Sequence, residues 1–89
     1  MNDIIAKMRT DWTVVAKDRR ECEAWTAEDE AQIGEAVKAA VASGKEEQII
    51  LWARWLGDLA ASTIALKAII LSIDTRIRDA ARKQREAKA

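Results

Sequence analysis

The chain has 89 residues, of which 49% are hydrophobic, and its formal net charge is zero. This length fits one domain over residues 1–89 and leaves a single chain only a modest core to bury. Because the chain contains no proline and only three glycines, it has few residues with which to build turns. Long helices joined by very short connections are therefore expected.

Several residue types needed for catalytic or metal sites are scarce. The chain has no histidine, so the commonest metal ligand and the usual general base near neutral pH are missing. The single Cys22 excludes an internal disulfide and a thiolate zinc site. No glycine-rich phosphate loop is present either. We therefore expect no enzyme activity, no catalytic residues, no cofactor and no metal.

No feature of the sequence indicates a membrane protein. The N-terminal residues do not have the pattern of a signal peptide. The longest uncharged stretch is about eight residues, whereas a bilayer span needs roughly 20 apolar residues. The sequence therefore predicts a cytoplasmic protein.

Two shorter helices are predicted in the first half of the chain. The first covers about 3–24, where apolar residues recur every three or four positions with Arg19 as the exception. The second covers about 27–42. Thr26 is a favourable N-cap, the acidic residues that follow it suit the helix dipole, and Gly44 is a typical residue after a helix C-terminus.

A third, much longer helix is predicted over about 45–86. Apolar residues recur along it in alternating steps of three and four, the heptad pattern of a helix–helix seam, interrupted only by Thr63. Such a helix would be about 60 Å long, with Gly57 and residues 61–63 as the points where a bend is expected. The seam residues are Ile49, Trp52, Leu56, Leu59, Leu66, Ile70, Ile73 and Ile77.

This apolar stripe is longer and wider than the two shorter helices can cover. We therefore predict that the seam forms the core of a homo-oligomer, most simply a dimer. The predicted fold is an all-α, three-helix chain whose bundle is completed by self-association.

The four tryptophans are the only aromatic residues. Trp12 and Trp25 are expected to pack between the first helix and its neighbours, and Trp52 lies on the seam. Trp55 lies at the margin of the stripe, where it either packs in the core or anchors an interface, because tryptophan and arginine are over-represented among binding hot spots. The candidate partner-binding residues are Trp55, Arg54 and Leu51.

The C-terminal tail, residues 75–89, carries six Lys and Arg residues against two Asp and Glu residues. It is a candidate contact for nucleic acid or an acidic partner, although cations near a helix C-terminus also complement the helix dipole. The candidate contact residues are Arg76, Arg78, Arg82, Lys83 and Arg85.

These features together predict a non-enzymatic helical module that binds a larger protein stoichiometrically. In size and composition, though in no motif, the chain is similar to small proteins of phages and mobile elements that inhibit host complexes, the anti-CRISPR proteins among them. Two alternatives stay open: a nucleic-acid-associated accessory protein that uses the basic tail, and a structural assembly component.

Overall fold

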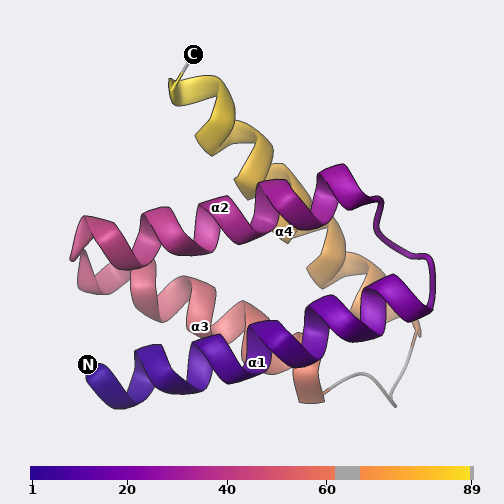
Figure 1. Cartoon of the computed structure of the whole chain (residues 1–89), viewed down its shortest axis with the longest axis horizontal. Helices are drawn as coiled ribbons and strands as arrows, with labels where there is room; N and C mark the ends of the chain where they lie inside the picture. The colour runs from indigo at the N-terminus through magenta and orange to yellow at the C-terminus, as the bar shows by residue number, and fades with distance from the viewer. Residues whose placement is uncertain (62–66, 89) are drawn as a thin grey trace.

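The computed structural model describes residues 1–61 and 67–88, except the side chains of residues 67–70, 85, 87 and 88. This part of the chain forms four helices and no strand: α1 (Asn2–Glu21), α2 (Ala27–Ser43), α3 (Glu46–Ala61) and α4 (Lys67–Lys88). The predicted all-α class is confirmed. Figure 1 shows α1 and α2 running antiparallel in front, with α3 and α4 crossing behind them.

The prediction of one long third helix is wrong. Helix α3 ends at Ala61 and α4 begins at Lys67, so the stretch predicted as one helix over 45–86 forms two. Helix α4 packs against α2 and α3, which removes from water an apolar stripe that a single extended helix would leave exposed. Of the two predicted bend points, Gly57 lies inside α3, and residues 61–63 extend outside the described residues.

The first helix ends earlier than predicted, at Glu21 instead of about residue 24. Glu23 has a positive φ of 56°, a left-handed conformation that cannot continue a right-handed helix. The N–H of Ala24 then donates to the carbonyl oxygen of Arg19 over 3.0 Å and closes the turn. Nearby, Arg20 donates to Glu30, and this hydrogen bond raises the pKa of the Arg20 guanidinium above its ordinary value.

Helix α2 begins at Ala27, where it was predicted to begin, and ends at Ser43, one residue beyond the predicted end. At the start of α2, the hydroxyl oxygen of Thr26 accepts from the N–H of Asp29 over 3.0 Å, and Asp29 Oδ2 accepts from the N–H of Thr26 over 3.1 Å. This reciprocal pair is a capping box. At the other end, Gly44 adopts a left-handed conformation with φ 67° and terminates the helix.

Residues from all four helices form one apolar core. Its fully buried large side chains are Met8, Val15, Ile33, Leu56, Leu59 and Ile77. The predicted seam residues Ile49, Trp52, Leu56, Leu59, Ile73 and Ile77 are buried within the chain itself, whereas the side chains of Leu66 and Ile70 lie outside the described residues. The described part of the seam is therefore covered without a second chain, and self-association stays a prediction.

Two tryptophans fill the contact between α1 and the start of α2. The rings of Trp12 and Trp25 are stacked, with centroids 6.0 Å apart and planes inclined by 27°. Gly34 of α2 lies against Trp12, because a Cβ at this position would be only 3.3 Å from Trp12 Cζ2. Glycine at position 34 therefore lets α2 approach α1 closely, and Trp12 and Trp25 both pack in the core region, as the sequence predicted.

A buried ion pair links α4 to the C-terminal end of α1. Arg19 is 4% exposed and Asp74 is 6% exposed, and Arg19 Nε donates to Asp74 Oδ1 over 3.2 Å. Arg19 also donates to Asp18. One turn along α4, Arg78 Nη2 donates to the carbonyl oxygen of Ala24 over 2.6 Å. The pair explains why a charged residue interrupts the apolar spacing of the first helix.

Trp52→Ala tests the core assignment. Trp52 is 2% exposed, so we expect its truncation to lower the free energy of unfolding by about 3–5 kcal/mol through lost burial and a cavity. Leu71→Ala is the control, because Leu71 is 65% exposed. Urea denaturation measures both changes, and similar losses from the two variants would contradict the assignment.

Asp74→Ala tests the buried ion pair. It leaves the Arg19 guanidinium without its α4 partner in a dry environment, and we expect a loss of about 3–5 kcal/mol. Asp79→Ala, on the same helix, removes an exposed pair with Arg82 and should cost less than about 1 kcal/mol. Comparable urea midpoints for the two variants would show that the buried pair contributes no more to the stability of the fold than the exposed pair does.

Candidate functional site

The exposed side of α3 carries apolar residues near the start of the helix. Ile50 is 42% exposed and Leu51 is 37% exposed, while Trp55 is partly buried and Arg54 is exposed. Residues four apart are neighbours on a helix, so Ile50 lies beside Arg54 and Leu51 lies beside Trp55. We call these four residues the α3 surface.

A groove between α1 and α3 borders this surface on one side and has a volume of about 470 Å³. Its lining combines apolar and small residues with charged ones. Among the charged residues, Lys7 Nζ and Asp11 Oδ2 form an ion pair over 2.7 Å. The lining residues are Ile4, Lys7, Met8, Asp11, Ile50, Ala53, Arg54, Gly57 and Asp58.

A second groove borders the other side and is formed by α2, the start of α3, and α4. Its volume is about 310 Å³, and Lys45 is the only charged residue among the described residues that line it. The remaining lining residues are small, apolar, hydroxyl-bearing or amide-bearing: Ala39, Ala40, Ser43, Gln48, Leu51, Trp52, Trp55, Ala80 and Gln84. We call it the Trp55 groove.

The three residues predicted to bind a partner do not share one groove. Leu51 and Trp55 line the Trp55 groove, whereas Arg54 lines the groove between α1 and α3. Consecutive helix residues point about 100° apart, which separates Arg54 from Trp55. Sequence reasoning also missed Ile50 as a candidate contact, because its position next to the seam does not reveal which flank of the stripe stays exposed.

Trp55 is held in place by Trp52. The two rings meet edge to face, with centroids 5.2 Å apart and planes inclined by 83°. This arrangement is a favourable one for aromatic pairs. Because Trp52 is fixed in the core and its ring contacts Trp55, the Trp55 side chain that lines the groove is already ordered, so it would lose little side-chain entropy when a ligand packs on it.

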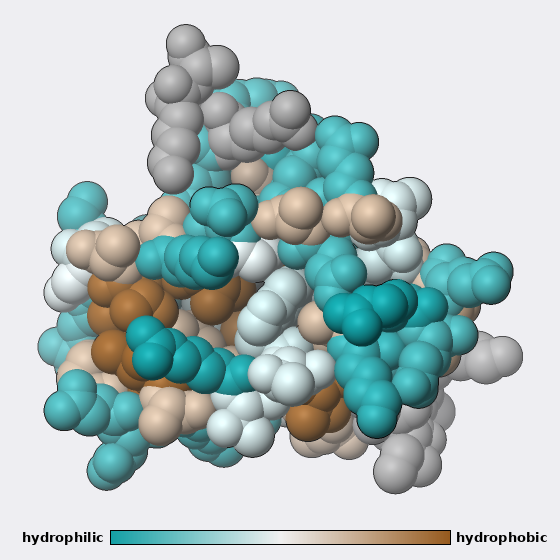
Figure 2. Space-filling view, viewed as in Figure 1, coloured by the Kyte–Doolittle hydropathy of each residue, from teal (hydrophilic) through white to brown (hydrophobic). Residues whose placement is uncertain are grey.

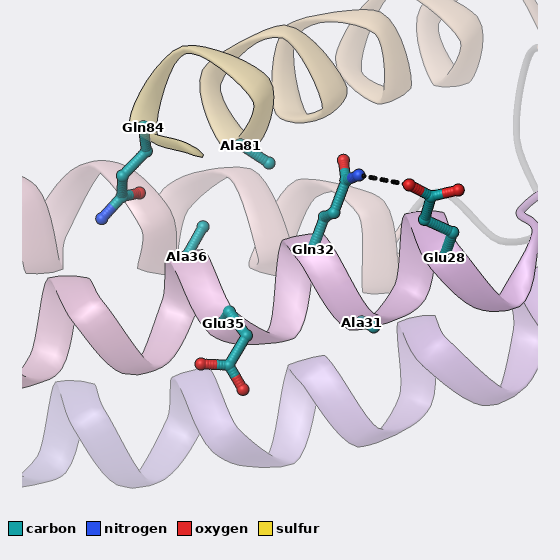
Figure 3. A pocket seen from close by; sticks show the side chains of 7 residues that line it. All are labelled: Glu28, Ala31, Gln32, Glu35, Ala36, Ala81 and Gln84. Carbon is teal, nitrogen blue, oxygen red and sulfur yellow. Dashed lines mark hydrogen bonds between the residues drawn. The ribbon is translucent and has the colours of Figure 1, made fainter. Parts of the chain in front are cut away.

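A third groove, of about 450 Å³, lies between α2 and α4. Figure 3 shows side chains of the two helices facing each other across it, with Gln32 donating to Glu28 over 3.1 Å. It is lined by Glu28, Ala31, Gln32, Glu35, Ala36, Ala81 and Gln84. Its apolar part consists of alanine methyl groups, so it offers less area for an apolar ligand than the Trp55 groove.

The described residues show no group of three or more carboxylates and thiols that could hold a metal ion. Of the basic residues predicted to contact nucleic acid, Arg78 is bound to the carbonyl oxygen of Ala24 and Arg82 to Asp79. Arg76 and Lys83 are exposed, and the side chain of Arg85 lies outside the described residues. Two of these cations are therefore engaged within the chain.

Comparisons with known proteins do not add to this geometry. No family model, curated protein or solved structure matches the chain. Within residues 1–61 and 67–88, none of the helices has the length and apolarity that crossing a membrane requires. Figure 2 shows apolar surface between the first half of α1 and the last half of α2, where Figure 1 places the start of α3.

Variants with a single tryptophan test the difference between Trp52 and Trp55. With the other three tryptophans replaced by Phe, Trp52 should emit at shorter wavelength and resist acrylamide, because it is 2% exposed. Trp55 should be quenched more readily, because it is only partly buried and lines the groove. Equal quenching constants in the folded protein would show that Trp55 is not accessible to a ligand.

Proposed function

We propose that the protein is a non-enzymatic binding module that holds a segment of another protein on the α3 surface and in the Trp55 groove. Exposed Ile50 and Leu51 on a helix whose opposite face is buried support this proposal. Apolar side chains gathered on a rigid element are typical of protein-binding sites.

The lining of the Trp55 groove indicates the chemistry of the bound segment. Trp55 and Leu51 provide an apolar wall for one large apolar side chain, and Ser43, Gln48 and Gln84 provide groups for hydrogen bonds. Among the described lining residues the charged one, Lys45, is a cation. The proposed ligand is therefore an extended or helical protein segment in which an apolar residue lies close to an Asp or Glu.

The observation that carries the proposal is the arrangement of Trp55, which is partly buried, ordered by Trp52 and open to the groove. A ligand in the groove would complete the burial of Trp55, and full burial is the usual environment of a tryptophan hot spot. A binder of this kind acts by occupying its target, as the small inhibitors of phages and mobile elements do. We place its action in the cytoplasm, because the single exposed thiol of Cys22 suits a reducing compartment.

The second candidate is a nucleic-acid contact through α4, with exposed Arg76 and Lys83 in its favour. The engagement of Arg78 and Arg82 within the chain weakens this candidate. The third candidate, a structural assembly component, has no specific contact in its support.

A displayed random-peptide library tests the proposed function. We expect the wild-type protein to enrich peptides that combine a large apolar residue with a nearby carboxylate. For such a peptide, Trp55→Ala should lower the affinity about 30-fold, the equivalent of 2 kcal/mol for a hot spot. Calorimetric titration of the synthesised peptide measures this change.

Leu71→Ala is the matched control, because it removes an exposed apolar side chain of α4 that does not line the groove. It should leave the peptide affinity unchanged. Enrichment of basic peptides, or equal affinities for the Trp55→Ala and control proteins, would refute the proposal. Salt-dependent binding of duplex DNA, lost on charge reversal of Arg76 and Lys83, would favour the second candidate.

A further inference from the structure

The Trp55 groove and the groove between α2 and α4, which we call the acidic groove, lie end to end. Gln84 of α4 lines both of them. On α2, the lining of the acidic groove extends to Ala36 and the lining of the Trp55 groove begins at Ala39. Figure 3 shows Gln84 at one end of the acidic groove and Glu28 at the other. The two grooves therefore follow α2 as one, which we call the joint groove.

The shape of the joint groove suits an extended segment of chain. Helices α2 and α4 pack against each other, and an extended segment needs less width between them than a helix, whose diameter is about 10–12 Å. Because alanine carries a single methyl group, the main chain of a bound segment can approach both helices closely. The side-chain amide of Gln84 can donate to and accept from that main chain. The lining alanines are Ala31, Ala36, Ala39, Ala40, Ala80 and Ala81.

The two ends of the joint groove carry opposite charges. Among the described lining residues, the charged ones are Glu28 and Glu35 in the acidic groove and Lys45 in the Trp55 groove. The N–H of Lys45 donates to Ser43 Oγ over 3.1 Å, which holds Lys45 beside the end of α2. A segment with a carboxylate at one end and a cation at the other is complementary to this arrangement, and the reverse orientation would bring like charges together.

Both glutamates can accept from a ligand cation. Glu35 pairs with Lys38 over 3.8 Å, but the two side chains are 74% and 80% exposed, and such pairs contribute little to stability. Glu28 accepts from Gln32 Nε2 over 3.1 Å, and a carboxylate has two oxygens that can each accept more than one hydrogen bond. A lysine or arginine in the acidic groove therefore gains contacts at small cost to the fold.

The length of α2 sets the spacing between the two charges of the ligand. Ser43 follows Glu35 by eight residues and Glu28 by fifteen, which correspond to about 12 Å and about 22 Å along a helix. An extended chain covers about 3.3 Å per residue. The cation of a bound segment therefore lies about four to seven residues from the carboxylate that faces Lys45.

We propose that one extended segment of the partner protein occupies the whole joint groove. Its apolar residue packs on Trp55, its Asp or Glu faces Lys45, and its main chain crosses Gln84. A Lys or Arg at the stated spacing then binds to Glu28 and Glu35. Because the segment keeps its anchor on Trp55, this proposal rests on the proposed function, to which it adds the basic residue and its distance from the carboxylate.

Extended forms of a library-selected peptide test the spacing. The peptide is lengthened at either terminus with arginines four and seven residues from its carboxylate, or with glutamine in place of both arginines. By calorimetric titration, extension at one terminus should make the arginine peptide bind about 10-fold more tightly than the glutamine peptide. Arginines within two residues of the carboxylate should give no such gain, because they do not reach the acidic groove.

The variant Glu28→Gln/Glu35→Gln tests the acidic groove. It removes both charges and keeps the side-chain shapes, so the arginine peptide should bind no more tightly than the glutamine peptide. An unchanged affinity for the glutamine peptide shows that this variant is folded. Glu21→Gln/Glu23→Gln is the matched control, because it removes two exposed carboxylates that line none of the three grooves. It should retain the 10-fold difference.

Trp55→Ala separates this proposal from the proposed function, because it should weaken both peptides by the same factor. Equal affinities of the two peptides for wild type, or a difference that survives in Glu28→Gln/Glu35→Gln, would overturn the joint groove and leave the Trp55 site intact. If Trp55→Ala changes neither affinity, or if the library selects no peptide, the proposed function fails and the joint groove fails with it.

Discussion

The buried pair of Arg19 and Asp74 determines how α4 packs on the rest of the molecule. The apolar residues that α4 buries include Ile73, Ile77 and Ala81, and aliphatic contacts of this kind tolerate small shifts along a helix. An ion pair in a dry environment does not, because a shift that separates Arg19 from Asp74 leaves the buried Asp74 carboxylate without its partner and Arg19 with only its pair to Asp18. The hydrogen bond from Arg78 to the Ala24 carbonyl then attaches α4 to the turn after α1. The path of the chain between α1 and α2 and the position of α4 are therefore linked.

The position of α4 in turn shapes the candidate binding surface. Helix α3 contacts α1, α2 and α4, and these contacts cover the face that carries Trp52 and Leu56. The opposite face, with Ile50 and Leu51, remains exposed. Trp55 lies at the boundary, where Ala80 and Gln84 of α4 close the far side of its groove. The groove therefore exists only where α4 is docked.

Most of the local structure could be predicted from the sequence, because short-range physics determines it. Thr26 and Gly44 mark the ends of α2 through capping and backbone conformation, and the apolar period identifies Ile49 and Trp52 as core. The division between α3 and α4 could not be predicted, because the period continues across it and tertiary packing decides the outcome. Arg19 was the available clue to the buried pair, since it interrupts an apolar face. The exposure of Ile50 depends on which flank of α3 its neighbours cover, and a single helical pattern carries no such information.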